Sequence, residues 1–107
     1  MQTRIVSFTA QPQHREKVQQ IFDGQITSAL RKLPGFVDFC VLQDKDDQNK
    51  FLSLTFWNTR QDADRYHHDQ YPKLRGLLDP YMTKPGELHE FDVYLSTSHR
   101  IAAGKAA

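Results

Sequence analysis

The chain has 107 residues, of which 38% are hydrophobic and 25% are charged. These values are typical of one globular domain and exclude a disordered or low-complexity chain. Fourteen Lys and Arg residues face thirteen Asp and Glu residues, and no long run of one sign occurs, so the balance argues against binding to nucleic acid or to an anionic membrane.

The first half of the chain predicts a strand, a helix and a second strand. Apolar and polar residues alternate over residues 3–10, as in a strand with one buried face. A helical stripe with a period of 3.6 residues follows, made of Val18, Ile21, Phe22, Ile26, Ala29, Leu30 and Leu33. Pro34 and Gly35 should end this helix, because proline lacks the N–H group and glycine permits the turn.

The next segment predicts an antiparallel hairpin. Residues 36–43 and 51–57 have strand composition, and the polar run 44–50 between them is typical of a turn. Both faces of the second of these strands carry large apolar side chains, which are Leu52, Leu54 and Phe56 on one face and Phe51 and Trp57 on the other. We therefore expect both faces of the sheet to be covered.

The remainder predicts a second helical region and a last strand. Thr59 and Asp62 have the spacing of a capping box, so a helix should begin there. Pro72 should bend or restart this helix. Alternation over residues 88–97 predicts the fourth strand.

The order β-α-β-β-α-β is that of an α+β, ferredoxin-like fold with both helices on one face of an antiparallel sheet. An apolar sheet face left bare would mark an interface, so we expect a homodimer that packs through its sheet faces. Residues 1–100 form the predicted domain, and residues 101–107 form a loosely ordered tail.

The N-terminal segment and the single cysteine give further expectations. Neither a signal peptide nor a stretch of about 20 apolar residues is recognisable, so a cytoplasmic location without membrane contact is expected. Cys40 lies among apolar residues and should be a buried, unreactive thiol.

Three segments together resemble a known family. They are the strand FLSLTFW that ends in Trp, the following NTRQDADRYHHDQYPKL with its polar cap and Tyr-His step, and the closing strand HEFDVYLSTS. They resemble the antibiotic biosynthesis monooxygenase (ABM) superfamily over residues 2 to about 100. The resemblance implies a dimeric α/β barrel and a cofactor-independent monooxygenase that oxidises a small phenolic, quinol or polyketide-like metabolite with O2. The alternative is a non-catalytic dimeric module that binds a small ligand or a partner.

The haem-degrading branch of that superfamily uses an Asn on the first strand and a Trp and a His in the second helical region. Aligned from Trp57, those positions hold Ser7, Tyr66 and Gly76. The sequence therefore argues against haem degradation.

In the resembling monooxygenases the substrate lies between helices and sheet, where a base and a dry pocket are enough for reaction with oxygen. His67 and His68 are the candidate bases, since imidazole exchanges protons near neutral pH. Adjacent helical residues point about 100° apart, so at most one can face a pocket. We favour His67, which follows Tyr66, although both histidines would also fit a solvated helix surface.

Several aromatic and polar residues are further candidates for the pocket. Tyr66, with His67, is a predicted catalytic residue, because a phenol can donate a hydrogen bond to a developing oxyanion. Tyr71, Trp57, Phe56 and Ser7 are predicted to line the substrate pocket. Core packing is the alternative explanation of Tyr66 and the favoured one for Trp57, and a dimer contact would explain Tyr71.

Other site chemistries find no support in the sequence. His67, His68 and Asp69 are adjacent on a predicted helix and diverge, so they do not form a metal site. No set of nucleophile, base and orienting residue can be assembled, which argues against a hydrolase. We expect no cofactor and a small aromatic molecule as the ligand.

Overall fold

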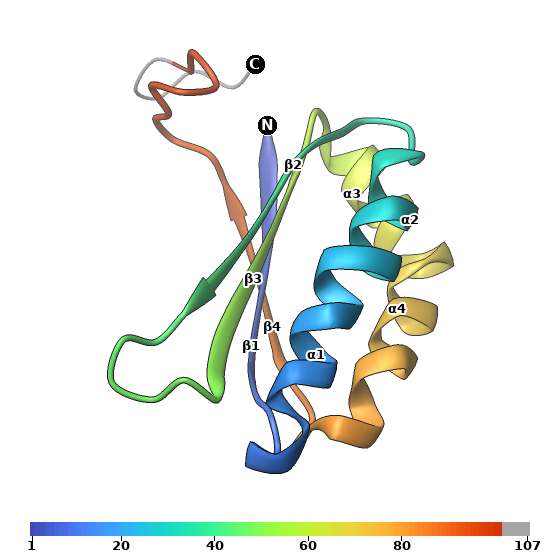
Figure 1. Cartoon of the computed structure of the whole chain (residues 1–107). Coiled ribbons are helices and arrows are strands. Elements are labelled where there is room, and N and C mark those ends of the chain that lie inside the picture. The colour runs from blue at the N-terminus through green and yellow to red at the C-terminus, as the bar shows by residue number, and fades with distance from the viewer. Residues whose placement is uncertain (102–107) are drawn as a thin grey trace.

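The computed structural model describes residues 1–101, which form a four-stranded antiparallel sheet with all helices on one face (Figure 1). The strands are β1 (Gln2–Thr9), β2 (Phe36–Gln43), β3 (Lys50–Trp57) and β4 (Glu87–Asp92). Their order across the sheet is β2-β3-β1-β4. This arrangement confirms the predicted α+β, ferredoxin-like fold.

Two helical regions connect the strands. The first consists of η1 (Pro12–His14), α1 (Arg15–Ile21), the π-helical turn η2 (Phe22–Ile26) and α2 (Thr27–Arg31). The second consists of α3 (Arg60–Asp69), α4 (Tyr71–Leu78) and η3 (Asp79–Tyr81). Each region is thus broken into short helices, and the breaks lie beside the cavity described below.

The prediction of one regular helix up to Leu33 was wrong at η2. In an uninterrupted α-helix starting from Val18, the position seven residues later, Gln25, would return to the sheet. The π-turn adds one residue, so that Ile26 and then Leu30 face the core, where both are buried. The wider turn keeps the apolar stripe in phase with the sheet.

The second helical region begins and restarts where the sequence predicts. The Thr59 hydroxyl accepts a hydrogen bond from the backbone N–H of Asp62 at 3.1 Å, which is the predicted cap. Pro72 stands in the first turn of α4, where the missing N–H costs nothing. The helical region is therefore interrupted between Asp69 and Tyr71.

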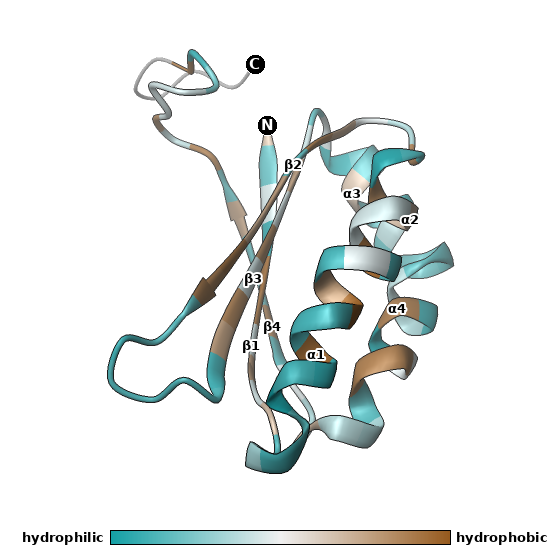
Figure 2. Cartoon of the chain, in the orientation of Figure 1, coloured by the Kyte–Doolittle hydropathy of each residue, from teal (hydrophilic) through white to brown (hydrophobic). Residues whose placement is uncertain are grey.

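The core fills the space between the helices and the sheet. The rings of Phe8, Phe22 and Phe51 pack together, with centroids 5.1 to 6.2 Å apart. Trp57 and Leu30 are fully buried in the same cluster. Hydrophobic residues lie along the strands, while the turn between β2 and β3 is polar (Figure 2).

The other face of the sheet, which we call the open face, carries no helix (Figure 1). Large apolar side chains remain exposed on it, among them Leu42 (52%), Leu52 (40%) and Phe91 (54%). The Cys40 thiol is partly exposed on this face rather than buried as expected, and its pKa is raised by desolvation and by neighbouring Asp38.

The fourth strand is shorter than predicted and ends at Asp92. Ser96 pairs instead with Ile101 in a tight turn, and the backbone N–H of Ile101 donates to the Ser96 carbonyl at 2.8 Å. His99 in this turn packs on Phe56 of the open face, with ring centroids 5.1 Å apart. Ile101 is buried, and the rest of the predicted loose tail, residues 102–107, lies outside the described residues.

A side chain should not be tolerated at Gly35 but should be tolerated at Gly76. Gly35 has a φ of 76°, and a Cβ there would collide with the Asp62 carboxylate that belongs to the helix cap. We expect Gly35→Ala to lower the free energy of unfolding by about 2 kcal/mol or more, from backbone strain and loss of the cap. Gly76→Ala, in open space on α4, should raise it by up to about 1 kcal/mol. Urea unfolding measures both, and equal effects would contradict this account.

Candidate functional site

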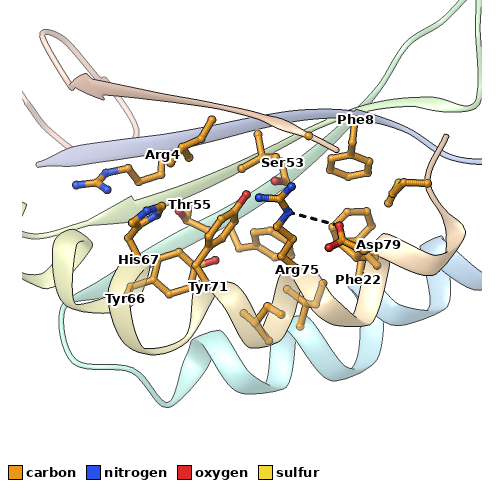
Figure 3. Close-up of a pocket in the computed structure, with 18 residues that line it drawn as sticks. Arg4, Phe8, Phe22, Ser53, Thr55, Tyr66, His67, Tyr71, Arg75 and Asp79 are labelled. Atoms are coloured by element: carbon orange, nitrogen blue, oxygen red, sulfur yellow. Dashed lines mark hydrogen bonds and ion pairs between the residues drawn. The ribbon is translucent and has the colours of Figure 1, made fainter. Parts of the chain in front are cut away.

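A cavity of about 50 Å³ lies between the helices and the helix-facing side of the sheet (Figure 3). Its buried walls come from β1 and β3 and from both helical regions, and include Arg4, Phe8, Phe22, Ile26, Thr55, Tyr66, Leu74 and Met82. Half-exposed residues of α4 and β4, such as Tyr71, Arg75 and Leu88, complete the lining. The cavity therefore opens beside the β4 edge of the sheet.

Three of the predicted site residues meet at one end of this cavity. Tyr66 and His67 come from the last turns of α3, and Tyr71 comes from the start of α4. The His67 and Tyr71 rings stack with centroids 5.1 Å apart, and the Tyr66 and Tyr71 rings are 6.1 Å apart in an edge arrangement. The break between α3 and α4 brings these rings together (Figure 3).

His68 takes no part in this cluster. Its side chain is 89% exposed, and its Nδ1 lies 2.8 Å from the Asp69 carboxylate on the solvent side of α3. Adjacent helical positions diverge, so the chain presents one histidine to the cavity and the other to solvent.

Trp57 lies behind the cavity wall and does not line it. Its ring is fully buried and stacks on Tyr66 with centroids 4.6 Å apart. Its indole N–H donates to the Thr55 hydroxyl at 2.9 Å. Because both Tyr66 and Thr55 line the cavity, Trp57 supports two wall residues from within the core.

Phe56 and Ser7, predicted as pocket residues, lie on the open face instead. Neighbouring strand residues point to opposite faces, and Trp57, adjacent to Phe56, points to the helices. Ser7 similarly alternates with Val6 and Phe8, which line the cavity. The structure therefore separates these two side chains from the Tyr66, His67 and Tyr71 cluster.

Both tyrosines of the cluster favour their protonated form. Burial, with a smaller contribution from Tyr71, raises the pKa of Tyr66 well above its ordinary value. Burial also raises the pKa of Tyr71, although the Arg75 guanidinium partly opposes this effect. At neutral pH both phenols are therefore neutral hydrogen-bond donors.

Sequence reasoning missed three polar lining residues, namely Arg4, Arg75 and Asp79. Ser53 and Thr55 also line the cavity, as polar residues within a strand can. Arg75 Nε lies 3.4 Å from Asp79 Oδ1, one turn further along the chain, and its guanidinium reaches over the cavity (Figure 3). The spacing of four residues on a predicted helix was a detectable signal for this pair. The signal for Arg4 was a charged residue in phase with Val6 and Phe8.

Arg4 is a buried charge that is fully paired. Its Nη2 lies 2.6 Å from Asp64 Oδ1 and 2.8 Å from Gln2 Oε1, and its Nη1 lies 2.9 Å from Glu90 Oε1. The hydrogen bond from Arg4 is the main reason that the pKa of Asp64 is lowered. With its donors engaged, Arg4 joins β1 to α3 and β4 rather than presenting a free charge to the cavity.

Removing this charge should destabilise the protein in a pH-dependent way. A carboxyl whose pKa is lowered in the folded state adds stability above its unfolded pKa and loses it as the pH falls through the folded pKa. We expect Arg4→Met to lower the urea midpoint at pH 7, and the difference from the wild type to narrow towards pH 3. Arg60→Met is the control, because the exposed Arg60 is 3.9 Å from the same Asp64. A difference in urea midpoint between the wild type and Arg4→Met that stays constant with pH would contradict this role of Arg4.

Residues 1–101 contain neither a cluster of metal-ligating side chains nor a helix that could span a membrane. Within this part of the chain, no three His, Cys, Asp or Glu side chains lie close enough together to hold a metal ion. No helix in the same residues has the length and apolar character needed to cross a membrane.

Solved structures of similar shape were found for this chain. SnoaB, a cofactor-independent oxygenase from Streptomyces nogalater, is 18% identical with a TM-score of 0.76, and the match covers 90% of this chain and 95% of SnoaB. Rv0793 from Mycobacterium tuberculosis is 16% identical with a TM-score of 0.73, covering 90% of this chain and 97% of Rv0793. A conserved protein from Methanosarcina mazei is 19% identical with a TM-score of 0.71, and the match covers 85% of this chain and 91% of that protein. These likenesses establish the fold.

The comparison with sequence families goes further than the fold. No curated protein is similar enough in sequence to count as a relative. The family model described as "Antibiotic biosynthesis monooxygenase" nevertheless matches residues 1–73, which include β1 to β3, α3 and all three clustered residues, Tyr66, His67 and Tyr71. The chain therefore belongs to the antibiotic biosynthesis monooxygenase family.

Proposed function

We propose that this protein is a cofactor-independent monooxygenase that oxidises a small phenolic, quinol or polyketide-like molecule with O2. The observation that carries the proposal is the convergence of His67, Tyr66 and Tyr71 on a largely apolar cavity. Membership of the ABM family supports it. The similarity in fold to SnoaB, which is named as a cofactor-independent oxygenase, supports it as well.

The residues of the cluster have complementary roles in this proposal. The His67 imidazole accepts the proton of the substrate hydroxyl, and the resulting phenolate is electron-rich enough to reduce oxygen itself. Neutral Tyr66 and Tyr71 donate hydrogen bonds to the substrate oxygen as negative charge develops on it. For a simple phenol the reaction balances as phenol plus O2 giving quinone plus water. One oxygen atom enters the ring and the other leaves as water with two substrate hydrogens.

Oxygen uptake tests the proposal directly. The protein, freed of metal with a chelator, is offered hydroquinones, naphthols and anthrones in an oxygen electrode, with heat-denatured protein as the control. We expect uptake above the control with at least one ring class and formation of the matching quinone. A ligand that binds and is recovered unchanged after prolonged aerobic incubation would instead indicate a non-catalytic binding protein.

We also propose that the working form is a homodimer joined through the open faces. The support is the group of exposed apolar side chains on that face, including Leu42, Leu52 and Phe91. One chain has a mass of 12.5 kDa. Light scattering at micromolar concentration should give twice this value.

A charge placed on the open face should weaken this dimer. We expect Leu52→Glu to shift the protein towards monomers, because burying an unpaired carboxylate against apolar side chains is costly. Gln19→Glu, on the exposed side of α1, is the control and should leave the mass unchanged. A monomeric wild type would contradict the proposed assembly.

A further inference from the structure

The π-turn η2 frames one wall of the cavity. Its first and last residues, Phe22 and Ile26, both line the cavity and are 6% and 4% exposed. The three residues between them, 23–25, are exposed. The extra residue of the turn therefore bulges into solvent while the two ends of the turn remain against the cavity.

Hydrogen bonds from Thr27 hold this turn. The Thr27 hydroxyl donates to the Phe22 carbonyl at 2.6 Å, and the Thr27 backbone N–H also donates to that carbonyl. In a regular α-helix the Phe22 carbonyl would instead accept from Ile26, four residues later. Single π-turns inside helices occur frequently at functional sites.

The turn lies at the inner end of the cavity. Lining residues beside the opening, such as Arg75 and Leu88, are half-exposed, whereas Phe22 and Ile26 are buried. Phe22 also packs against Phe39 on β2, the strand at the opposite edge of the sheet from β4, with ring centroids 6.2 Å apart. The wall on the side away from β4 therefore includes Phe22, Ile26 and Phe39, and a ring that enters past Arg75 extends towards it.

The volume of the cavity makes this inner wall decisive. A cavity of about 150 Å³ holds one benzene molecule, whereas the cavity here measures about 50 Å³. Any aromatic ligand must therefore displace wall atoms, and the position of the inner wall limits how far a second ring can extend. We propose that the π-turn determines substrate length, with Phe22 and Ile26 as its specificity-determining residues. This inference rests on the proposed function only in taking the cavity as the substrate site.

Binding without turnover tests the inference. Dissociation constants for phenol and 1-naphthol are measured by calorimetry under anaerobic conditions, so that no oxidation occurs. Ile26→Ala should raise the preference for 1-naphthol over phenol about tenfold, since a few methylene groups in an apolar pocket are worth at least that much. Val18→Ala is the matched control, because Val18 is fully buried on the same helical region but does not line the cavity.

Deletion of Gln25 tests the turn itself. Without this residue, Ile26, Leu30 and Leu33 would follow Phe22 at spacings of three, seven and ten, which is a regular α-helical stripe. We expect the variant to fold, with Ile26 displaced relative to Phe22 by about the 1.5 Å rise of one residue. The preference between the two ligands should change by about threefold or more.

The outcomes separate this inference from the proposed function. A shifted preference between phenol and 1-naphthol in both Ile26→Ala and the Gln25 deletion, together with no oxygen uptake by the wild type in the aerobic assay, would support the inference and reject the monooxygenase. An unchanged preference in either variant, or an equal shift in Val18→Ala, would overturn the inference. Failure of both ligands to bind the wild type would overturn it together with the proposed substrate site.

Discussion

Replacing His67 with alanine should lower phenol-dependent oxygen uptake about a hundredfold. General-base catalysis by a positioned side chain contributes roughly this factor or more. His67 is the histidine that lines the cavity, and its ring lies against Tyr71, which can hydrogen-bond to the same substrate oxygen. Without the imidazole, the substrate hydroxyl must lose its proton to water, and the phenolate that reacts with oxygen becomes scarce.

The dependence on pH gives this prediction a second readout. A substrate that needs no base because it is already ionised should be oxidised almost equally by the wild type and His67→Ala. Raising the pH towards the pKa of the free phenol should therefore narrow the gap in rate between the two proteins. A gap that does not change with pH would show that His67 acts on something other than the substrate proton.

His68→Ala provides the matched control, because it removes the same side chain one position along the same helix. His68 is 89% exposed and its only hydrogen-bond partner among the described residues is Asp69. We expect this variant to keep the wild-type rate and the wild-type urea midpoint. Full activity in His67→Ala would remove the assigned base, and equal losses in both variants would indicate a general effect on α3.

The fold could be predicted because its local signals agree with one another. Thr59 and Asp62 form the cap that their spacing indicates, and Pro72 restarts the helix as expected. Alternation along β1 also identifies the helix-facing residues Val6 and Phe8. In each case the signal depends on the backbone geometry of a few neighbouring residues, which the sequence specifies directly.

The π-turn could not be predicted for a physical reason. Phe22 and Ile26 are four residues apart, a spacing that fits both an α-helical stripe and a π-turn. The sequence already puts Ile26, and not Gln25, on the apolar stripe, but only packing against the sheet decides that the helix takes one extra residue to bring Ile26 inward. That decision depends on tertiary packing.

Only part of the site could be predicted, because the sequence does not show which face of β3 points to the helices. Phe56 and Trp57 are adjacent in a strand and must point to opposite faces, so they could not both lie beside one pocket. Apolar residues occupy both faces of β3, which left the choice between them open. The structure places Trp57 under the helices and Phe56 beneath His99.

Replacing Trp57 with alanine should have the largest effect on stability. The side chain is fully buried, and truncating a buried aromatic residue to alanine costs about 3–5 kcal/mol, because the surrounding structure collapses only partly into the space. The Thr55 hydroxyl, which is itself buried, would also lose the hydrogen bond that it accepts from the indole N–H. Tyr94→Ala is the control, because it removes an aromatic ring that is 67% exposed beyond the end of β4 and should cost less than about 1 kcal/mol.

Trp57 connects this stability to the proposed chemistry. Tyr66 is held against the cavity by its stacking on Trp57, so Trp57→Phe should retain much of the fold while leaving the Tyr66 ring less constrained. In urea unfolding we expect the phenylalanine variant to fall between the wild type and Trp57→Ala. Under conditions in which Trp57→Phe is fully folded, its oxygen uptake should still be reduced, because Tyr66 no longer has a fixed position from which to donate to the substrate oxygen. An unchanged rate in the folded Trp57→Phe protein would show that Trp57 serves the core alone, and that Tyr66 needs no support from it.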